Sequence, residues 1–223
     1  MESTTYYVDI ETLALPTSRR EHTRPTDASM KYGNTKDPVK RQSKLDAAIK
    51  DWERGTTAAL SALTGQVACI GLARGEEPVG ILEGDEADIL KSFWNTVGSS
   101  LADSTNRFIG FYSNSFDIPF LIRRSMLTGV TVPYFVYNEI RQYRPTMFID
   151  VIDQWRCGDR QLHIKLEMLC AAMGIAVKQG DVKGHNFGEF WNGTPEQREL
   201  ARQYCKSDVD ATRELAQRMG IRF

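Results

Sequence analysis

The chain has 223 residues, with 28 Lys and Arg against 29 Asp and Glu, which gives a formal net charge of -1. This length favours one or at most two domains, and the hydrophobic fraction of 41% excludes disordered, collagenous and fibrous classes. No apolar run approaches the ~20 residues of a membrane span, and the first residues lack the pattern of a signal peptide. We therefore expect a cytoplasmic protein that makes no membrane contact.

The first third of the chain predicts a strand, a basic helix and a hairpin. Thr5 to Ile10 is a β-rich run, and the polar stretch after it has no periodicity until Asp37. Asp37 followed by proline supplies an N-cap and a first helical residue, so a helix is expected over about 38–60. The apolar run from Gly65 to Ala73 and the shorter run from Val79 to Leu82 predict two strands of a hairpin.

Helices and strands then alternate to the end of the chain. Apolar spacing predicts helices over 85–101, 116–127 and 162–173, strands over 107–111 and 147–152, and a last helix to about 219 that the capping box Thr194 to Gln197 opens. Five strands with intervening helices indicate one α/β domain over 1–223. We expect a mixed five-stranded sheet flanked by helices on both faces, with a basic helical insertion at about 17–62.

The predicted insertion is basic, whereas the rest of the chain is acidic. Residues 18–60 contain ten Lys and Arg against six Asp and Glu, a balance of +4, which leaves -5 for the remainder. A basic segment on an acidic body is typical of a protein that handles a polyanion beside bound cations. The candidate contacts to such a polyanion are Lys36, Lys40, Arg41 and Lys44. The alternative is a solvated loop and helix face.

Two acids are expected at one end of the first strand. Asp9 and Glu11 are two residues apart, so their side chains point to the same face of the sheet, while Val8 and Ile10 point to the other. The D-x-E pattern alone is weak evidence, because a chain of this composition contains about one by chance. Asp51 and Glu53 are a second example, in a predicted helix where neighbours two apart diverge.

Asp208 gives a stronger signal than the D-x-E pair. On a helical projection it lies at the middle of the apolar face of the last helix, among Leu200, Ala201, Tyr204, Cys205, Ala211, Thr212, Leu215, Ala216 and Met219. An unpaired carboxylate there would cost several kcal/mol, so a cation or strong donors must meet it inside the protein. Tyr204, one turn earlier, offers a phenol to the same place. Neutralisation of Asp208 by an arginine or a helix N-terminus is the structural alternative.

Two further acids stand at strand ends. Asp117 follows the predicted strand 107–111 within Ser113 to Leu121, near the edge to which the first strand brings Asp9 and Glu11. Its structural alternative is an acid in the first turn of a helix, which the helix dipole favours. Asp150 is either an acid that contacts the residues of the site without itself belonging to it, or an ordinary charge at a strand end.

Histidine and cysteine give no sign of a zinc centre. His22, His163 and His185 are scattered, and such residues are more often structural hydrogen bonders. The four cysteines contain no C-x-x-C pair, which argues against a zinc cluster and a disulfide framework, so we expect reduced core residues. They are Cys69, Cys157, Cys170 and Cys205.

The order of these motifs resembles that of a known nuclease family. D-x-E on the first strand, S-F-D-I-P-F-L after a middle strand and Y-x-x-x-D on the last helix look like the three exonuclease motifs of the DEDD superfamily. The match is to its tyrosine branch, since the histidine branch would place His where Gln203 stands. The sequence is most similar to stand-alone predicted 3'-5' exonucleases, including phage-associated members, that are related to the family B DNA polymerase proofreading domain. Segments 35–38, 64–71 and 178–184 also resemble that group.

The resemblance implies an RNase H-like fold and a role for each motif residue. Asp9, Glu11, Asp117 and Asp208 would be ligands of two divalent cations, Mg²⁺ or Mn²⁺, and Tyr204 would orient the attacking water. The implied substrate contacts are Thr12, Leu13, Tyr112 and Asn114, together with the basic residues named above. Relatives usually carry Asn where this sequence has Tyr112, so the substrate contacts at Tyr112 and Asn114 stay open.

The expected activity is a metal-dependent 3'-to-5' exonuclease acting on single-stranded or frayed DNA ends. Trimming of RNA is the alternative among enzymes, because carboxylates and phosphates do not report the 2'-hydroxyl. A nucleic-acid-binding module that kept the fold without catalysis is the alternative from another class. The sequence contains no polymerase-sized domain, so proofreading would require association in trans with replication or repair proteins.

Overall fold

The computed structural model describes residues 4–55, 57–99, 106–140, 146–177 and 180–221. Contacts divide the chain into two units, each with its own packing. Unit 1 comprises Met1–Glu11 and Val67–Phe223, and unit 2 comprises Thr12–Gln66. The predicted insertion at 17–62 falls inside unit 2.

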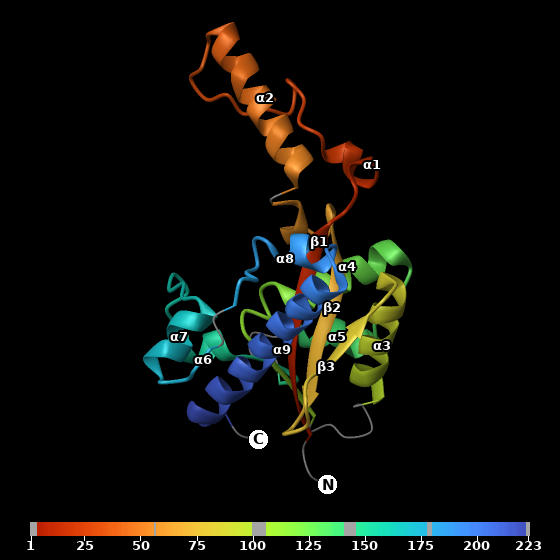
Figure 1. Ribbon diagram of the computed structural model, residues 1–223, viewed down its shortest axis with the longest axis vertical. Coiled ribbons are helices and arrows are strands. Elements are labelled where there is room, and N and C mark those ends of the chain that lie inside the picture. The colour runs from red at the N-terminus through yellow and green to blue at the C-terminus, as the bar shows by residue number, and fades with distance from the viewer. Residues whose placement is uncertain (1–3, 56, 100–105, 141–145, 178–179, 222–223) are drawn as a thin grey trace. The chain divides into compact units, whose positions relative to one another are not determined.

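Five strands form one mixed sheet (Figure 1). They are β1 (Thr5–Ala14), β2 (Gly65–Arg74), β3 (Gly80–Glu83), β4 (Arg107–Gly110) and β5 (Phe148–Asp150), in the order β3-β2-β1-β4-β5. The β2–β3 hairpin is antiparallel, whereas β1 with β4 and β4 with β5 are parallel. The expected five-stranded mixed sheet is therefore confirmed.

Helices cover both faces of the sheet in unit 1. They are α3 (Glu86–Ser99), α4 (Asp117–Thr128), α5 (Tyr134–Glu139), α6 (Val151–Arg156), α7 (Leu166–Ala172), α8 (Phe187–Trp191) and α9 (Pro195–Arg218). Tyr7 of β1 lies in a buried cluster with Leu169 of α7 and Leu215 of α9. Tyr6, its neighbour, points to the other face and stacks on Phe108 at 4.8 Å, which in turn packs against Phe93 of α3. Odd-numbered residues of β1 therefore face α9.

The last helix begins where the sequence predicts. The Thr194 side chain accepts a hydrogen bond from the Gln197 amide, and the Gln197 side chain accepts one from the Thr194 amide. Pro195 occupies the first turn, where its missing N–H costs nothing. This reciprocal capping fixes the start of the helix that carries Tyr204 and Asp208.

The end of β5 and the start of α7 differ from the sequence prediction for identifiable reasons. The strand expected over 147–152 ends at Asp150, because the Asp150 carboxylate accepts a hydrogen bond from the Ile152 amide and caps α6. The helix expected over 162–173 begins only at Leu166. The preceding Ile164 amide donates to the Tyr112 hydroxyl, 52 residues away in sequence, which holds this segment out of the helix.

Unit 2 contains α1 (Thr17–Arg20), α2 (Pro38–Arg54) and two single 3-10 turns, Glu21–Thr23 and Ala58–Leu60. Asp37 caps α2 as predicted, but the helix ends at Arg54 rather than near residue 60. Gly55 follows with φ 74°, a left-handed conformation that glycine adopts without steric cost. The buried guanidinium of Arg20 donates to carbonyls at this helix end, so this one cation of the basic segment is structural.

Cys69, Cys170 and Cys205 are buried and free, as expected, but Cys157 is exposed, which corrects the prediction that all four lie in the core. Among the described residues, no helix combines the length and apolarity needed to cross a bilayer.

Close packing of α9 on β2 depends on Gly71. A Cβ atom at this position would lie 2.8 Å from Val209 Cγ2 and 3.0 Å from Cys205 Sγ, both on α9. We predict that Gly71→Ala displaces α9 and destabilises the protein by about 1–3 kcal/mol, the usual cost of overpacking. Thermal unfolding should show this as a lower Tm. Gly80→Ala in neighbouring β3 is the control, since its Cβ would come no closer than 3.7 Å to any atom. Equal Tm values for the two variants would contradict this account.

Candidate active site

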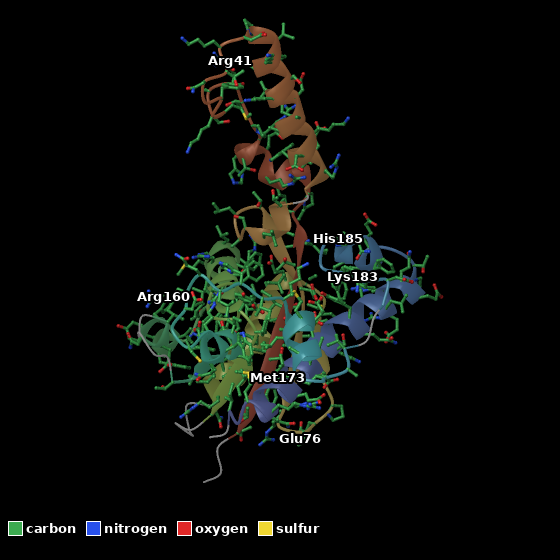
Figure 2. All side chains as sticks on the ribbon, turned by 90° about the vertical axis from the view of Figure 1, so that its left-hand side faces the viewer. Arg41, Glu76, Arg160, Met173, Lys183 and His185 are labelled. Carbon is green, nitrogen blue, oxygen red and sulfur yellow. The ribbon has the colours of Figure 1, made fainter. Side chains whose placement is uncertain are left out.

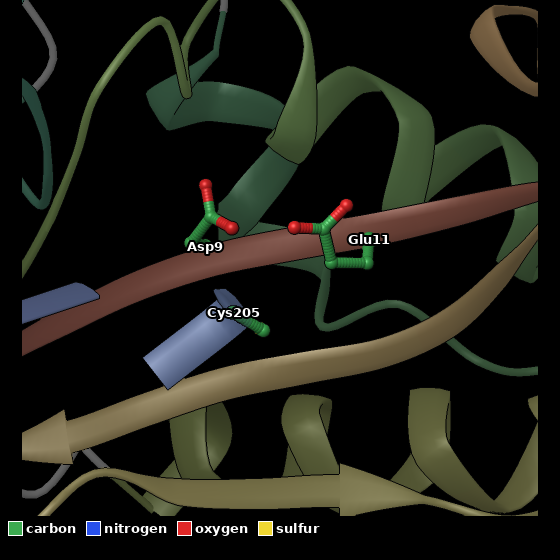
Figure 3. Close-up of side chains that lie close together, drawn as sticks. All are labelled: Asp9, Glu11 and Cys205. Atoms are coloured by element: carbon green, nitrogen blue, oxygen red, sulfur yellow. The ribbon is translucent and has the colours of Figure 1, made fainter. Parts of the chain in front are cut away.

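β1 brings two carboxylates together on the face that α9 covers. Asp9 and Glu11 are an even number of residues from Tyr7, so their side chains lie on the same face of β1 as that residue. Each offers an oxygen within 4.8 Å of the other and of Cys205 Sγ. Figure 3 shows the three side chains. Glu11 is 9% exposed. The period-2 prediction for this pair therefore agrees with the structure.

Asp117 joins the pair from the first turn of α4. Its carboxyl group is buried, and Oδ1 accepts a hydrogen bond from the Ile10 amide of β1 at 3.1 Å. The amide belongs to the residue between Asp9 and Glu11, so Asp117 lies directly beside them. The alternative considered from the sequence is that Asp117 is only an acid in the first turn of a helix, favoured by the helix dipole. That alternative does not account for the hydrogen bond from β1.

Asp208 and Tyr204 approach the same region from α9. The Tyr204 hydroxyl donates a hydrogen bond to Asp208, and burial followed by the charges of Asp208, Glu11 and Asp9 raises the pKa of the phenol. This places Tyr204 beside three of the acids. Among the described residues, no arginine forms an ion pair with Asp208, so the arginine alternative finds no support.

The four carboxylates oppose one another electrostatically. Burial, followed by the charges of the other three acids, raises the pKa of Asp9 well above its ordinary value. Burial and the charge of Asp208 do the same for Glu11. Burial raises the pKa of both Asp117 and Asp208 to about 7, against the opposing hydrogen bonds from Ile10 and Tyr204. Such a cluster is suited to bind a multivalent cation, which would favour the ionised form of every member.

Cys205 lies close to this cluster, yet its chemistry differs from that of the acids. A hydrogen bond with Cys69 and then burial raise the pKa of its thiol, and the neighbouring carboxylates raise it further. The thiol therefore stays protonated. A neutral thiol is a poor metal ligand, so the oxygen donors of the acids define the site.

Two pockets of unit 1 meet at Tyr204 and Asp208. One of about 580 Å³ extends towards Val182 and Lys183, and one of about 610 Å³ extends towards Tyr112 and His163. Lys165, Glu167 and Met168 line both. Asp208 thus lines both pockets, and Asp9 lines the second.

Lys183 is a functional candidate that the residue-by-residue prediction missed. Its charge lowers the pKa of Asp208 against the larger effect of burial. Asn186 holds the backbone of this segment by accepting from the Lys183 amide at 2.6 Å and donating to the Asp181 carbonyl. Figure 2 labels Lys183 on the ribbon. The only sequence signal was the resemblance of segment 178–184 to the family pattern.

Asp150 organises the loop between β4 and α4. Its carboxylate accepts hydrogen bonds from the amides of Tyr112 at 2.8 Å, Asn114 at 3.0 Å and Ile152 at 3.2 Å. Its charge also raises the pKa of Asp117. Asp150 therefore supports the loop that precedes Asp117 and is more than a strand-end charge.

The predicted substrate contacts take different positions. Tyr112 lines the 610 Å³ pocket, whereas the Asn114 side chain donates to the Phe148 carbonyl at 3.1 Å and serves the fold. Thr12 and Leu13 continue β1 beyond Glu11, inside unit 2.

The four predicted basic contacts all lie in unit 2. Lys36 and Lys40 are exposed. Arg41, labelled in Figure 2, stacks over the Tyr32 ring at 4.3 Å. Lys44 donates to Thr35.

Comparison with known proteins identifies the family. Residues 77–219, more than half of the chain, match a family described as a predicted 3'-5' exonuclease related to the exonuclease domain of PolB. The chain belongs to this family. The matched segment includes Asp117, Tyr204 and Asp208, while Asp9 and Glu11 precede it.

The chain also resembles individual proteins. An uncharacterized protein of Methanocaldococcus jannaschii is 27% identical over 164 residues, which cover 71% of this chain and 88% of that protein. The family B DNA polymerase of the hyperthermophilic archaeon Pyrobaculum calidifontis superposes with a TM-score of 0.60 at 17% identity. This match covers 98% of the present chain and 25% of the polymerase. It supports the predicted α/β fold.

Removal of one acid should stabilise the metal-free protein. In Asp208→Asn the folded state no longer holds a carboxyl whose pKa is raised from 3.8 to about 7. Because the folded form of the wild type binds this proton more tightly than the unfolded form, its stability falls as pH rises between these values. We predict a higher Tm than wild type in EDTA, by about 2–4 °C for each kcal/mol relieved, with a larger gain at pH 8 than at pH 5.

The matched control is Asp210→Asn, two residues along α9, where the carboxylate is exposed and paired with Arg213. This variant should gain no stability. A Tm of Asp208→Asn at or below that of the wild type at pH 8 would show that the carboxylate carries no net cost.

Proposed function

We propose that this protein is a metal-dependent 3'-to-5' exonuclease that hydrolyses phosphodiester bonds at single-stranded or frayed DNA 3' ends. The observation that carries the proposal is the convergence of Asp9, Glu11, Asp117 and Asp208 on one buried region, with the Tyr204 hydroxyl donating to Asp208. Membership in a family of predicted 3'-5' exonucleases supports it.

The four acids are the residues that would hold two divalent cations, Mg²⁺ or Mn²⁺. Their oxygen donors match the preference of these ions, and their mutual repulsion is the charge that cations would offset. When bound, such a pair activates a water and stabilises the leaving 3' oxygen of an in-line displacement. The carboxylates fix the place where this chemistry occurs.

The protein's own groups orient the reactants around that place. Tyr204 stays a neutral phenol because its pKa is raised, so its hydroxyl can position the attacking water beside Asp208. Lys183 and Lys165, which line the adjacent pockets, offer positive charge to the phosphates of the strand.

Hydrolysis of end-labelled oligonucleotides tests the proposal directly. Single-stranded DNA labelled at the 3' or the 5' end is incubated with Mg²⁺ or Mn²⁺, beside the same sequence as RNA. The 3' label should be released at once as a mononucleotide, while the 5' label should pass through a ladder of shortening products. Preferential RNA shortening would favour the exoribonuclease, and binding with no hydrolysis in any divalent metal would favour a non-catalytic module.

Tyr204→Phe should separate catalysis from metal binding. The variant keeps the ring, which packs 6.3 Å from Phe187, and deletes the hydroxyl that donates to Asp208. We predict that turnover falls by roughly 10² to 10⁴, the range for one positioned catalytic group, while calorimetric metal titration stays as in the wild type. Single-turnover rates measure the loss. Full activity across pH and metal concentration would reduce Tyr204 to a packing residue.

We further propose that the basic residues of unit 2 contact the substrate strand. Lys36, Lys40, Arg41 and Lys44 lie at or near the N-terminal end of α2, a helix in which no residue is buried. Replacement of all four by Gln should weaken strand binding. It should also flatten the dependence of log K on log salt, by about 0.7 for each phosphate of a single strand that the variant no longer neutralises.

Fluorescence anisotropy over a salt series measures both quantities. Lys91→Gln, which removes an exposed lysine of α3, is the control and should leave the slope unchanged. An unchanged slope in the fourfold variant would assign α2 a structural role only.

A further inference from the structure

The 610 Å³ pocket continues beyond the acids to an aromatic pair. Its lining includes Asp9, Tyr204 and Asp208 of the candidate site, and also Tyr112 and His163. A molecule whose reacting end lies at the carboxylates can therefore place its next group against these two rings. Neither ring belongs to the cluster of acids.

Tyr112 is held in place at three points. Its φ of 58° lies in the left-handed region, which bulky residues rarely adopt, so the surrounding structure must fix it. Its amide donates to Asp150, and its hydroxyl accepts from the Ile164 amide at 3.1 Å. The Arg156 guanidinium lies over the ring, 5.0 Å from its centroid. The ring is therefore a rigid platform.

His163 lies against this platform. Its ring is nearly parallel to that of Tyr112, with an interplanar angle of 13° and centroids 6.5 Å apart. Its backbone is held on both sides, because the Leu162 carbonyl accepts from Arg156 Nε and the Ile164 amide donates to Tyr112. The residue is nevertheless exposed. An exposed aromatic ring on a fixed support, inside a pocket, is suited to stack on a flat ligand.

We propose that His163, supported by Tyr112, stacks on a nucleobase of the strand whose 3' end lies at the four carboxylates. This inference rests on the proposed function and names a residue that would bind its substrate. Stacking on an aromatic side chain requires a base that has left the duplex stack. The pocket thus selects single-stranded or frayed ends, and it accepts any base because every base has a π-face.

Abasic substitution tests the inference by equilibrium binding. Fluorescein-labelled 12-mers with 3'-terminal phosphorothioates, differing only in one abasic residue at one of the last four positions, are titrated in Ca²⁺ by anisotropy. In the wild type, one abasic position should weaken binding by about 5- to 150-fold, the range for one stacked base. His163→Ala should bind the intact strand more weakly by a similar factor and lose the penalty at that position. His163→Phe should keep both the affinity for the intact strand and the abasic penalty.

Two further variants separate stacking from loss of structure. Tyr134→Ala removes an exposed aromatic ring of α5, 81% accessible, and should change no binding constant. Tyr112→Phe keeps the platform ring but removes the acceptor for the Ile164 amide, and should reduce the abasic penalty without abolishing folding, as thermal unfolding would verify.

The outcomes distinguish this inference from the proposed function. If the protein hydrolyses DNA but shows no abasic penalty, the stacking site is wrong and the exonuclease proposal stands. The same conclusion follows if the penalty is unchanged in His163→Ala. Failure of the folded wild type to bind or hydrolyse any oligonucleotide overturns both.

Discussion

Repulsion among four carboxylates, two of them buried and two half-buried, is the constraint on which the rest of the site depends. Asp9, Glu11, Asp117 and Asp208 each have a raised pKa, first because burial removes water and then because like charges lie nearby. The described residues offset little of this cost, through the Ile10 amide, the Tyr204 hydroxyl and the charge of Lys183. A fold that maintains this arrangement bears a free-energy cost that binding of cations would offset, which is the usual relation between a functional site and the fold that carries it.

The scaffold holds these acids on regular elements rather than on free loops. Alternation along β1 fixes the pair of residues 9 and 11, and the capped helix α9 carries residue 208. Because Gly71 has no Cβ atom, α9 can pack closely on β2. Asp150 holds the loop before Asp117 by accepting two backbone hydrogen bonds, from Tyr112 and Asn114. Rigid support of this kind keeps reacting groups within the narrow tolerance that catalysis needs.

Local periodicity explains what the sequence could predict. The period of two in β1 identified the shared face of Asp9 and Glu11, the period of 3.6 in α9 identified Asp208 as an inward-facing acid, and Thr194 and Asp37 marked helix starts. Contacts between distant segments leave no such signal. The end of β5 at Asp150, which caps α6, and the late start of α7 both depend on side-chain contacts, the second with Tyr112, far away in sequence. For the same reason the effect of the Lys183 charge on Asp208 and the closeness of Cys205 to Asp9 and Glu11 became visible only in the fold.

The central claim is that the four acids together form one divalent-cation site, and crystals soaked in Mn²⁺ test it most directly through anomalous scattering. The account predicts two peaks whose protein ligands are Asp9, Glu11, Asp117 and Asp208, and loss of at least one peak in Asp208→Asn crystals soaked in the same way. Absence of any peak among these carboxylates at saturating Mn²⁺, in crystals that bind the ion elsewhere, would contradict it.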